Sequence, residues 1–136
     1  MTIIAVIGDC TTTTCIALAA GWPGDDLLVL EADPSGGSLA GWLDTPGAPS
    51  LATIVANIGG RDATDASVMS TVSAMTHHSI SGIRFIAAPL RALPARRAIE
   101  EAAVVVVPAL ATSSVTVLAD IGRRHPGDVA PALLGS

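Results

Sequence analysis

The sequence contains no lysine and no tyrosine, and it has only one phenylalanine and two tryptophans among 136 residues. All seven basic side chains are arginines, and they are scattered along the chain. The formal net charge is −5. Nucleic-acid-binding surfaces usually combine clustered basic residues with aromatic side chains that stack on bases. We therefore expect no contact with nucleic acid.

Cysteine is also scarce, because Cys10 and Cys15 are the only two. Their spacing matches neither a CxxC redox pair nor a zinc site, and two cysteines do not make a disulfide framework. No apolar run approaches the roughly 20 residues that a membrane-spanning helix needs. The N-terminus lacks the basic and apolar regions of a signal peptide. These absences predict a cytoplasmic chain without a transmembrane segment.

What the sequence does contain is aliphatic: half of the residues are hydrophobic, mostly Ala, Val, Leu and Ile. Apolar runs bounded by turn-forming residues predict strands at 2–8, 26–32, 83–88 and 115–121, the first of them buried on both faces. Helical patterns cover 12–20, 38–43, 50–58 and 66–75, and another helix begins near Pro94. The valine-rich stretch 102–110 is compatible with strand or helix, and we assign it to helix. Residues 129–136 allow the start of one more helix, and the histidines His77, His78 and His125 are assigned to loops.

Strands that alternate with helices predict an α/β fold with right-handed crossovers. We expect a small, mostly parallel sheet of about four strands with helices on both faces. In such sheets, ligands bind at the carboxyl ends of the strands. Here those ends carry residues 8–14, 33–37, 89–91 and 120–124, so any chemistry is expected there.

Three stretches occur in an order that makes the chain resemble the ParA/MinD-like P-loop ATPases, in particular divergent actinobacterial members. They are "TTTTCIALAAGWP", then "LLVLEADPSGGSLAGWL" with "PSLATIVANI", and finally "VTVLADIG". The resemblance covers most of the chain and implies a P-loop NTPase-like fold. It also implies ATP and magnesium as cofactors if the phosphate loop is functional.

The resemblance places Gly8 in a phosphate-binding loop and Thr11 where the family has its second lysine. Thr12 then matches the hydroxyl that coordinates magnesium, and Thr13 is its neighbour. The loop is shorter than the G-x-x-x-x-G-K-[ST] motif, and without lysine no ammonium can reach the β- and γ-phosphates. The alternative is a threonine-capped helix with no nucleotide role, which would still offer a weak anion site at its N-terminus.

The resemblance also assigns roles to acidic residues at the strand ends. Asp33 matches the catalytic acid that aids magnesium and the attacking water, and Glu31 matches the earlier acid of that pair. Asp120 matches the Walker B aspartate, so Thr12, Asp33 and Asp120 would surround magnesium. Ordinary turn-forming aspartates are the alternative. Arg123 and Arg124 match either arginines that act on a partner's phosphate or a solvated pair, and we favour the solvated pair.

The family's fold continues with further strands that residues 1–136 do not include. We therefore expect a single degenerate P-loop NTPase-like domain whose exposed sheet edge favours self-association or a protein partner. Two functions remain open. The absent lysine favours a non-catalytic scaffold or assembly partner without bound cofactor. The aligned aspartates keep open a weakly hydrolysing ATPase that positions cargo or a secretion or partition apparatus.

Overall fold

The computed structural model describes residues 1–58 and 62–123. Its elements, in chain order, are β1 (Thr2–Ile7), α1 (Thr11–Ala20), β2 (Leu27–Glu31), α2 (Leu39–Trp42), α3 (Leu51–Asn57), α4 (Asp65–Met75), β3 (His77–His78), β4 (Arg84–Ile86), α5 (Ala92–Val105), α6 (Val107–Leu110) and β5 (Thr116–Gly122). The strands form one sheet in the order β1-β5-β2-β4-β3. All neighbours pair in parallel except β3, which is antiparallel to β4. The predicted α/β class is confirmed.

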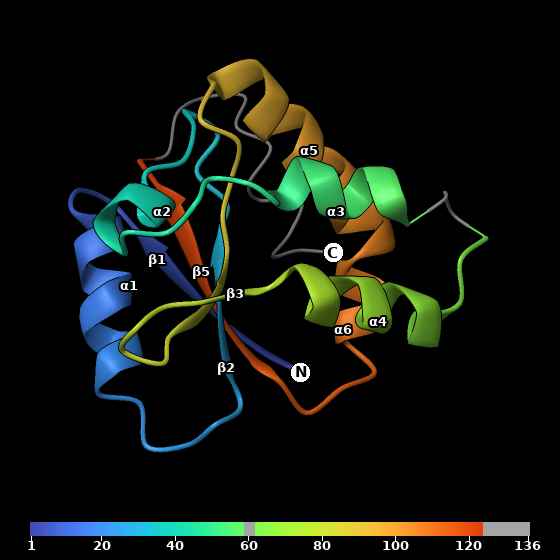
Figure 1. Ribbon diagram of the computed structural model, residues 1–136, viewed down its shortest axis with the longest axis horizontal. Coiled ribbons are helices and arrows are strands. Elements are labelled where there is room, and N and C mark those ends of the chain that lie inside the picture. Colours follow the sequence, from blue (N-terminus) through green and yellow to red (C-terminus); the bar gives the residue numbers. More distant parts are fainter. Residues whose placement is uncertain (59–61, 124–136) are drawn as a thin grey trace.

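Helices cover both faces of the sheet, as Figure 1 shows, with α1 and α2 on one side and α3 to α6 on the other. The alternation of side chains along a strand divides the core between these two layers. In β2, Leu28 and Leu30 pack with α3 to α6, while Leu27 and Val29 pack with α1 and α2. Both faces of the central strands are therefore buried, which explains their nearly continuous apolar runs.

The strand β1 lies at the edge of the sheet, so the prediction that both of its faces are buried is wrong. It pairs with β5 on one side, and no strand of the described chain pairs with its other side. Ile4 and Ile7 retain 37% and 46% of their surface accessible to solvent. An apolar run reports the hydrophobicity of a strand but not its place in the sheet, which depends on distant parts of the chain.

The short strand β3 is the second difference, because His77 and His78 were predicted to lie in a loop. The His77 ring stacks on Phe85 with ring centroids 5.1 Å apart, and its Nε2 lies 2.7 Å from the carbonyl oxygen of Pro49. These contacts give His77 a structural role at the antiparallel edge. His125 lies outside the described residues.

The valine-rich segment is helical, as predicted, and divides into α5 and α6 just before Pro108. The predicted N-cap Ser50 does begin α3, where its backbone N–H donates to Oγ1 of Thr53 at 3.1 Å. No helix in the described ranges combines the length and the apolar character that crossing a membrane requires. The helix predicted at 129–136 lies outside the described residues.

Candidate functional site

A crevice of about 640 Å³ opens at the carboxyl ends of the parallel strands. The β1–α1 loop, the start of α1, the β2–α2 connection and the end of β5 enclose it. Its lining residues are Gly8, Asp9, Cys10, Thr11, Thr12, Thr13, Asp33, Ser35, Ser38, Trp42, Gly122 and Arg123. The structure thus brings every predicted phosphate-loop residue together with Asp33, although Asp33 lies 20 or more residues further along the chain.

The loop between β1 and α1 is only three residues long and is tied to the neighbouring strand. Gly8 has a φ of +127°, which favours glycine, and its N–H donates to the Gly122 carbonyl at 3.0 Å. Cys10 follows with a φ of +57° and occupies the N-cap position of α1 without a side-chain cap. The expected threonine cap is therefore wrong, because all four threonines lie within the helix. The first-turn N–H groups of α1 still lack intrahelical acceptors and open toward the crevice.

Thr12 and Asp120 join α1 to β5 behind the crevice. The Thr12 hydroxyl donates to Oδ2 of Asp120 at 2.7 Å. Asp120 is completely buried, and its other carboxylate oxygen, Oδ1, has no hydrogen-bond partner among the described residues. A buried carboxylate oxygen without a donor is energetically costly. Thr12 and Asp120, two of the predicted magnesium residues, are therefore in direct contact.

Asp33, the third predicted magnesium residue, lies at the same edge of the sheet. Its Oδ1 accepts hydrogen bonds from the backbone N–H of Ser35 at 2.9 Å and from the Ser35 hydroxyl at 2.6 Å. This is the turn geometry that an aspartate before Pro34 and Ser35 commonly adopts. The carboxylate also lies against Gly122, where any Cβ would overlap it. Asp33 thus lines the crevice while it stabilises its own turn.

Glu31 is buried and does not line the crevice. Its Oε1 accepts from the N–H groups of Ser38 at 2.6 Å and Leu39 at 2.9 Å, and its Oε2 accepts from Ala88 at 2.9 Å. Burial raises the pKa of Glu31, the three N–H donors oppose that shift, and the nearby Asp120 carboxylate adds to it. The structure therefore gives Glu31, which the resemblance matches to the earlier acid of the pair, a backbone-binding role that joins the β2–α2 connection to the end of β4.

The two buried carboxylates also affect Cys15, which faces them from α1. Burial raises the pKa of the Cys15 thiol to about 12, with the Asp120 and Glu31 carboxylates as further causes. Cys15 is fully buried and remains a neutral thiol at physiological pH. Only Cys10, which is exposed and lines the crevice, is an accessible thiol.

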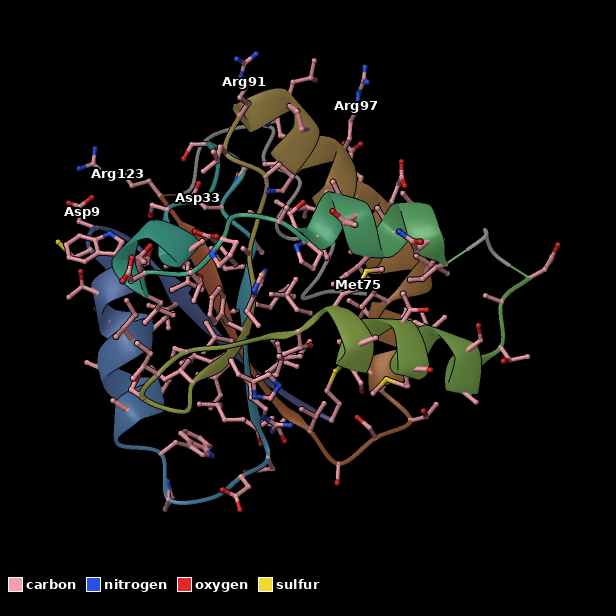
Figure 2. The ribbon with its side chains drawn as sticks, viewed as in Figure 1. Asp9, Asp33, Met75, Arg91, Arg97 and Arg123 are labelled. Atoms are coloured by element: carbon pink, nitrogen blue, oxygen red, sulfur yellow. The ribbon has the colours of Figure 1, made fainter. Side chains whose placement is uncertain are left out.

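Arg123 is the residue whose place the sequence analysis did not anticipate: it is assigned to a solvated pair with Arg124, and no arginine lies near the phosphate loop along the chain. It follows β5, and its Nε donates to Oδ1 of Asp9 in the loop. Figure 2 shows the Asp9 and Arg123 side chains next to each other, on the side of the molecule where Asp33 also lies. The pairing of β1 with β5 creates this contact. Arg124 lies outside the described residues.

A shallower hollow of about 430 Å³ adjoins the crevice and shares Asp33, Ser35 and Arg123 with it. Arg96 lines this hollow from α5. Figure 2 shows Arg91 and Arg97 extending outward at the same end of the molecule. Arg123 therefore lines both the crevice and the hollow, and Arg96 lines the hollow alone.

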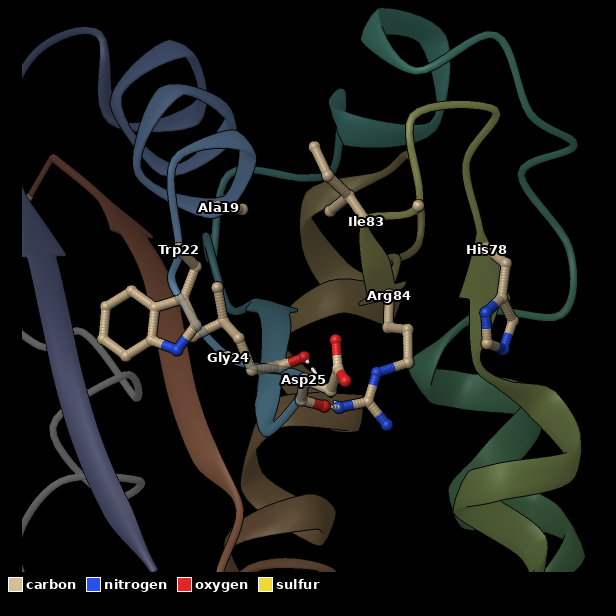
Figure 3. Close-up of a pocket in the computed structure, with 9 residues that line it drawn as sticks. Ala19, Trp22, Gly24, Asp25, His78, Ile83 and Arg84 are labelled. Carbon is tan, nitrogen blue, oxygen red and sulfur yellow. Dashed lines mark hydrogen bonds between the residues drawn. The ribbon is translucent and has the colours of Figure 1, made fainter.

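A second pocket, of about 310 Å³, lies at the opposite ends of the strands, beside the start of β2 and β4. Figure 3 shows Arg84 in this pocket, with its guanidinium directed at Asp25 and with Trp22 on the far side. The guanidinium donates to the carbonyls of Asp25 and of Leu27, the latter at 3.1 Å. Arg84 thus stabilises the loop before β2 and does not line the crevice.

Oxygen atoms at and just behind the crevice suit magnesium, whereas few donors or cations are present for nucleotide phosphates. Mg²⁺ prefers hard oxygen ligands and is usually held by one or two carboxylates together with substrate phosphates. Thr12 lines the crevice, and behind it Asp120, which is outside the lining, has an Oδ1 without a partner among the described residues. In the described chain, no cluster of three or more His, Cys, Asp or Glu could hold a metal ion. Phosphates would meet the helix N-terminus and one lining cation, Arg123, but no lysine.

Comparison with known proteins shows the fold. No protein-family model matches the chain, and no curated protein matches it. Among solved structures, it is similar to cobyrinic acid a,c-diamide synthase from Mycobacterium smegmatis with a bound ATP analog and magnesium, at 16% identity and a TM-score of 0.63. The same synthase with bound ADP and magnesium matches at 17% identity and a TM-score of 0.62.

Each match covers 98% of this chain and 55% of the synthase chain. The chain therefore spans about half the length of the synthase. With the five-stranded sheet and helices on both faces, the likeness shows a P-loop NTPase-like fold.

Proposed function

We propose that this chain is a degenerate P-loop protein of ParA/MinD type that acts as a non-catalytic scaffold or assembly partner. The observation that carries the proposal is that polar side chains of the crevice bond to one another. The hydroxyl of Thr12 is used by Asp120, Asp33 holds Ser35, and Arg123 pairs with Asp9. Thr12, Asp33 and Arg123 therefore have hydrogen-bond or ion-pair partners within the protein and do not depend on a ligand.

The charge of the site supports the same conclusion. Phosphoryl transfer depends on positioned cations that offset charge on the transferring group. Thr11 occupies the position that the resemblance assigns to lysine, and it is buried and uncharged. The three-residue loop also offers few backbone N–H groups to a phosphate. Binding of ATP is therefore expected to be weak, and hydrolysis slower still.

The edge strand β1 supports a role in assembly. Ile4 and Ile7 on β1 and Leu18 on α1 are large apolar side chains that stay 37%, 46% and 44% exposed. Within the described ranges no strand pairs with the outer side of β1, and backbone groups on such an edge are a template for pairing with another chain. We propose that this edge binds a second copy or a dedicated protein partner, in a reducing cytoplasm where both cysteines remain free thiols.

A specific observation favours a second candidate function, an ATP-binding and weakly hydrolysing ATPase that positions cargo or a secretion or partition apparatus. The buried Oδ1 of Asp120 lacks a partner among the described residues, and it belongs to the same carboxylate that holds Thr12. A magnesium ion brought by a nucleotide would satisfy this oxygen. The similar synthase was solved with ATP analog or ADP and magnesium, which is consistent with this alternative.

Calorimetric titration with ATP-magnesium distinguishes the two functions. The scaffold proposal predicts an affinity in the range of ~0.1–1 mM, with no measurable hydrolysis. The informative variant is Thr12→Ala, which removes the hydroxyl that contacts Asp120. Its matched control is Thr14→Ala, because Thr14 is exposed, lies on the same helix turn and donates only to the Cys10 carbonyl.

The outcome that favours the ATPase is equally clear. Micromolar binding that Thr12→Ala abolishes and Thr14→Ala preserves, together with release of phosphate from ATP, would show that the phosphate loop is functional. The scaffold proposal would then be abandoned.

A further inference from the structure

The Asp9–Arg123 pair spans the mouth of the crevice. Asp9 belongs to the loop after β1, and Arg123 directly follows β5. Both residues line the crevice. The pair therefore connects the segment that would bind phosphates to the one cation that the described lining contains.

The backbone holds these two residues side by side. The N–H of Gly8 donates to the carbonyl of Gly122 at 3.0 Å. The residues that follow these two glycines, Asp9 and Arg123, therefore begin side by side. Gly122 has a φ of +70°, a conformation that favours glycine and redirects the chain after the strand. The β1–β5 register also shifts between Val6 and Ile7, just before the loop. The position of Arg123 is thus set by the ends of two paired strands.

The ion pair is weak enough to exchange. The Arg123 and Asp9 side chains are 70% and 69% exposed. Ion pairs at such exposure contribute little because water and salt screen them. Nε is the guanidinium nitrogen bound to Asp9, and a guanidinium offers five donors in a planar fork that matches phosphate oxygens bidentately. A phosphate group can therefore replace a carboxylate at the same guanidinium.

We propose that Arg123 supplies the cation of this crevice in place of a lysine, and that the Asp9 carboxylate occupies it until a diphosphate group displaces it. This inference rests on the proposed weak affinity of the crevice and explains it, because Asp9 competes with the ligand. A second observation comes from behind the lining, where the carboxylate that accepts from Thr12 has a buried oxygen, Oδ1 of Asp120, without a partner among the described residues. A magnesium ion carried by the diphosphate would satisfy this oxygen. The ligand class is a diphosphate, either free or as part of a nucleotide.

Tryptophan fluorescence can report the binding at this crevice. The chain has two tryptophans: Trp42 lines the crevice and is 65% exposed, while Trp22 lines the pocket at the other end of the sheet. In a Trp22→Phe background, titration with pyrophosphate-magnesium and with ADP-magnesium therefore follows Trp42 alone. Calorimetry on the chain with both tryptophans measures the same dissociation constants and does not need the Trp22→Phe substitution.

Removal of the competitor and removal of the cation have opposite expected effects. Asp9→Asn is expected to tighten diphosphate binding by about two- to fivefold, the range that an exposed ion pair can contribute. Arg123→Gln is expected to weaken it by on the order of tenfold, since it removes a charge-assisted hydrogen bond. Asp62→Asn and Arg97→Gln are the matched controls, because they make the same charge changes at residues outside the crevice.

The results that overturn the inference differ from those that overturn the proposed function. Asp9 is not a competitor if Asp9→Asn binds pyrophosphate and ADP no more tightly than Asp62→Asn does. The same conclusion follows if Asp9→Asn binds neither ligand at millimolar concentration. If Arg123→Gln matches Arg97→Gln, Arg123 is not the cation. Tighter binding of pyrophosphate than of ADP indicates a free diphosphate as the ligand, and tighter binding of ADP indicates a nucleotide. Hydrolysis of ATP would contradict the scaffold role while the order of affinities could still hold.

Discussion

At the scale of single residues, two acidic side chains that the sequence presents as alike have different environments. Glu31 and Asp120 are register partners on neighbouring strands and are both buried. Three backbone N–H groups hold Glu31, whereas Asp120 has one hydroxyl donor and one oxygen without a partner among the described residues. Glu31 therefore has all of its hydrogen-bonding oxygens engaged by the backbone, whereas Asp120 keeps one oxygen that no described residue engages.

We predict that Glu31→Gln destabilises the protein by about 1–3 kcal/mol. The amide NH₂ of glutamine would face a backbone N–H that now donates to the carboxylate, so two donors would meet without an acceptor. The raised pKa also predicts a pH dependence. The folded state holds the Glu31 proton more tightly than the unfolded state, so this group's stabilisation is present below pH 4.5 and is lost as pH rises through the raised pKa.

Urea unfolding of wild type and Glu31→Gln across this pH range tests both statements. The difference in free energy of unfolding between the two should shrink as pH rises. Glu100→Gln on the exposed part of α5 makes the same chemical change and should leave the pH profile unaltered. Parallel profiles for wild type and Glu31→Gln would mean that burial does not raise the Glu31 pKa.

At the scale of elements, the β2–α2 connection depends on close approach of backbone to backbone. A Cβ on Gly37 would lie 2.6 Å from Oε2 of Glu31 and against the carbonyl of Ala88. Gly36, with a φ of +112°, meets the Leu90 carbonyl in the same way. The "PSGG" turn therefore packs onto the segment after β4, and this contact fixes a connection whose neighbouring residues Asp33, Ser35 and Ser38 line the crevice.

We predict that Gly37→Ala destabilises the protein by about 1–3 kcal/mol, the typical cost of forcing a methyl group into a packed position. Gly41→Ala on α2 is the matched control, since a Cβ added to Gly41 would have no other atom within 4 Å. It should be neutral or stabilising by up to about 1 kcal/mol, because alanine is the better helix former. Thermal unfolding of both variants tests the contrast, and equal effects would refute the tight contact at Gly37.

At the scale of the whole molecule, apolar surface remains at the β1 edge of the sheet. The opposite edge is the two-residue strand β3, whereas β1 is six residues long, and no described strand pairs with its outer side. The exposed Ile4 and Ile7 lie on that strand. This asymmetry favours association through β1 rather than through β3.

We predict that the purified chain associates at micromolar concentration and that Ile4→Lys shifts it toward the monomer. A charged side chain on an edge strand opposes pairing with another strand. Leu93→Lys is the control, because Leu93 is a large apolar residue that is 60% exposed on α5. Sedimentation velocity measures the distribution. A stable wild-type monomer, or equal effects of the two substitutions, would contradict association through β1.

The local features of this protein follow from the sequence. Apolar runs and turn residues predict four of the strands, most of the helices and the end of the sheet where the crevice lies. Hydrophobic periodicity and chain direction suffice for this, because each element's buried face and each strand's carboxyl end are local properties. The gathering of Thr12, Asp33 and Asp120 at one edge follows from the same rule.

The order of the strands was decided by tertiary structure alone. Pairing of β1 with β5 left Ile4 and Ile7 at an edge and brought Arg123 to Asp9, 114 residues away in sequence. The backbone contacts of Glu31 depend likewise on β4 lying beside β2. A sequence pattern states which faces must be buried but not which distant segment buries them. That choice depends on the packing of the entire chain, and here it determined where the crevice obtains its cation.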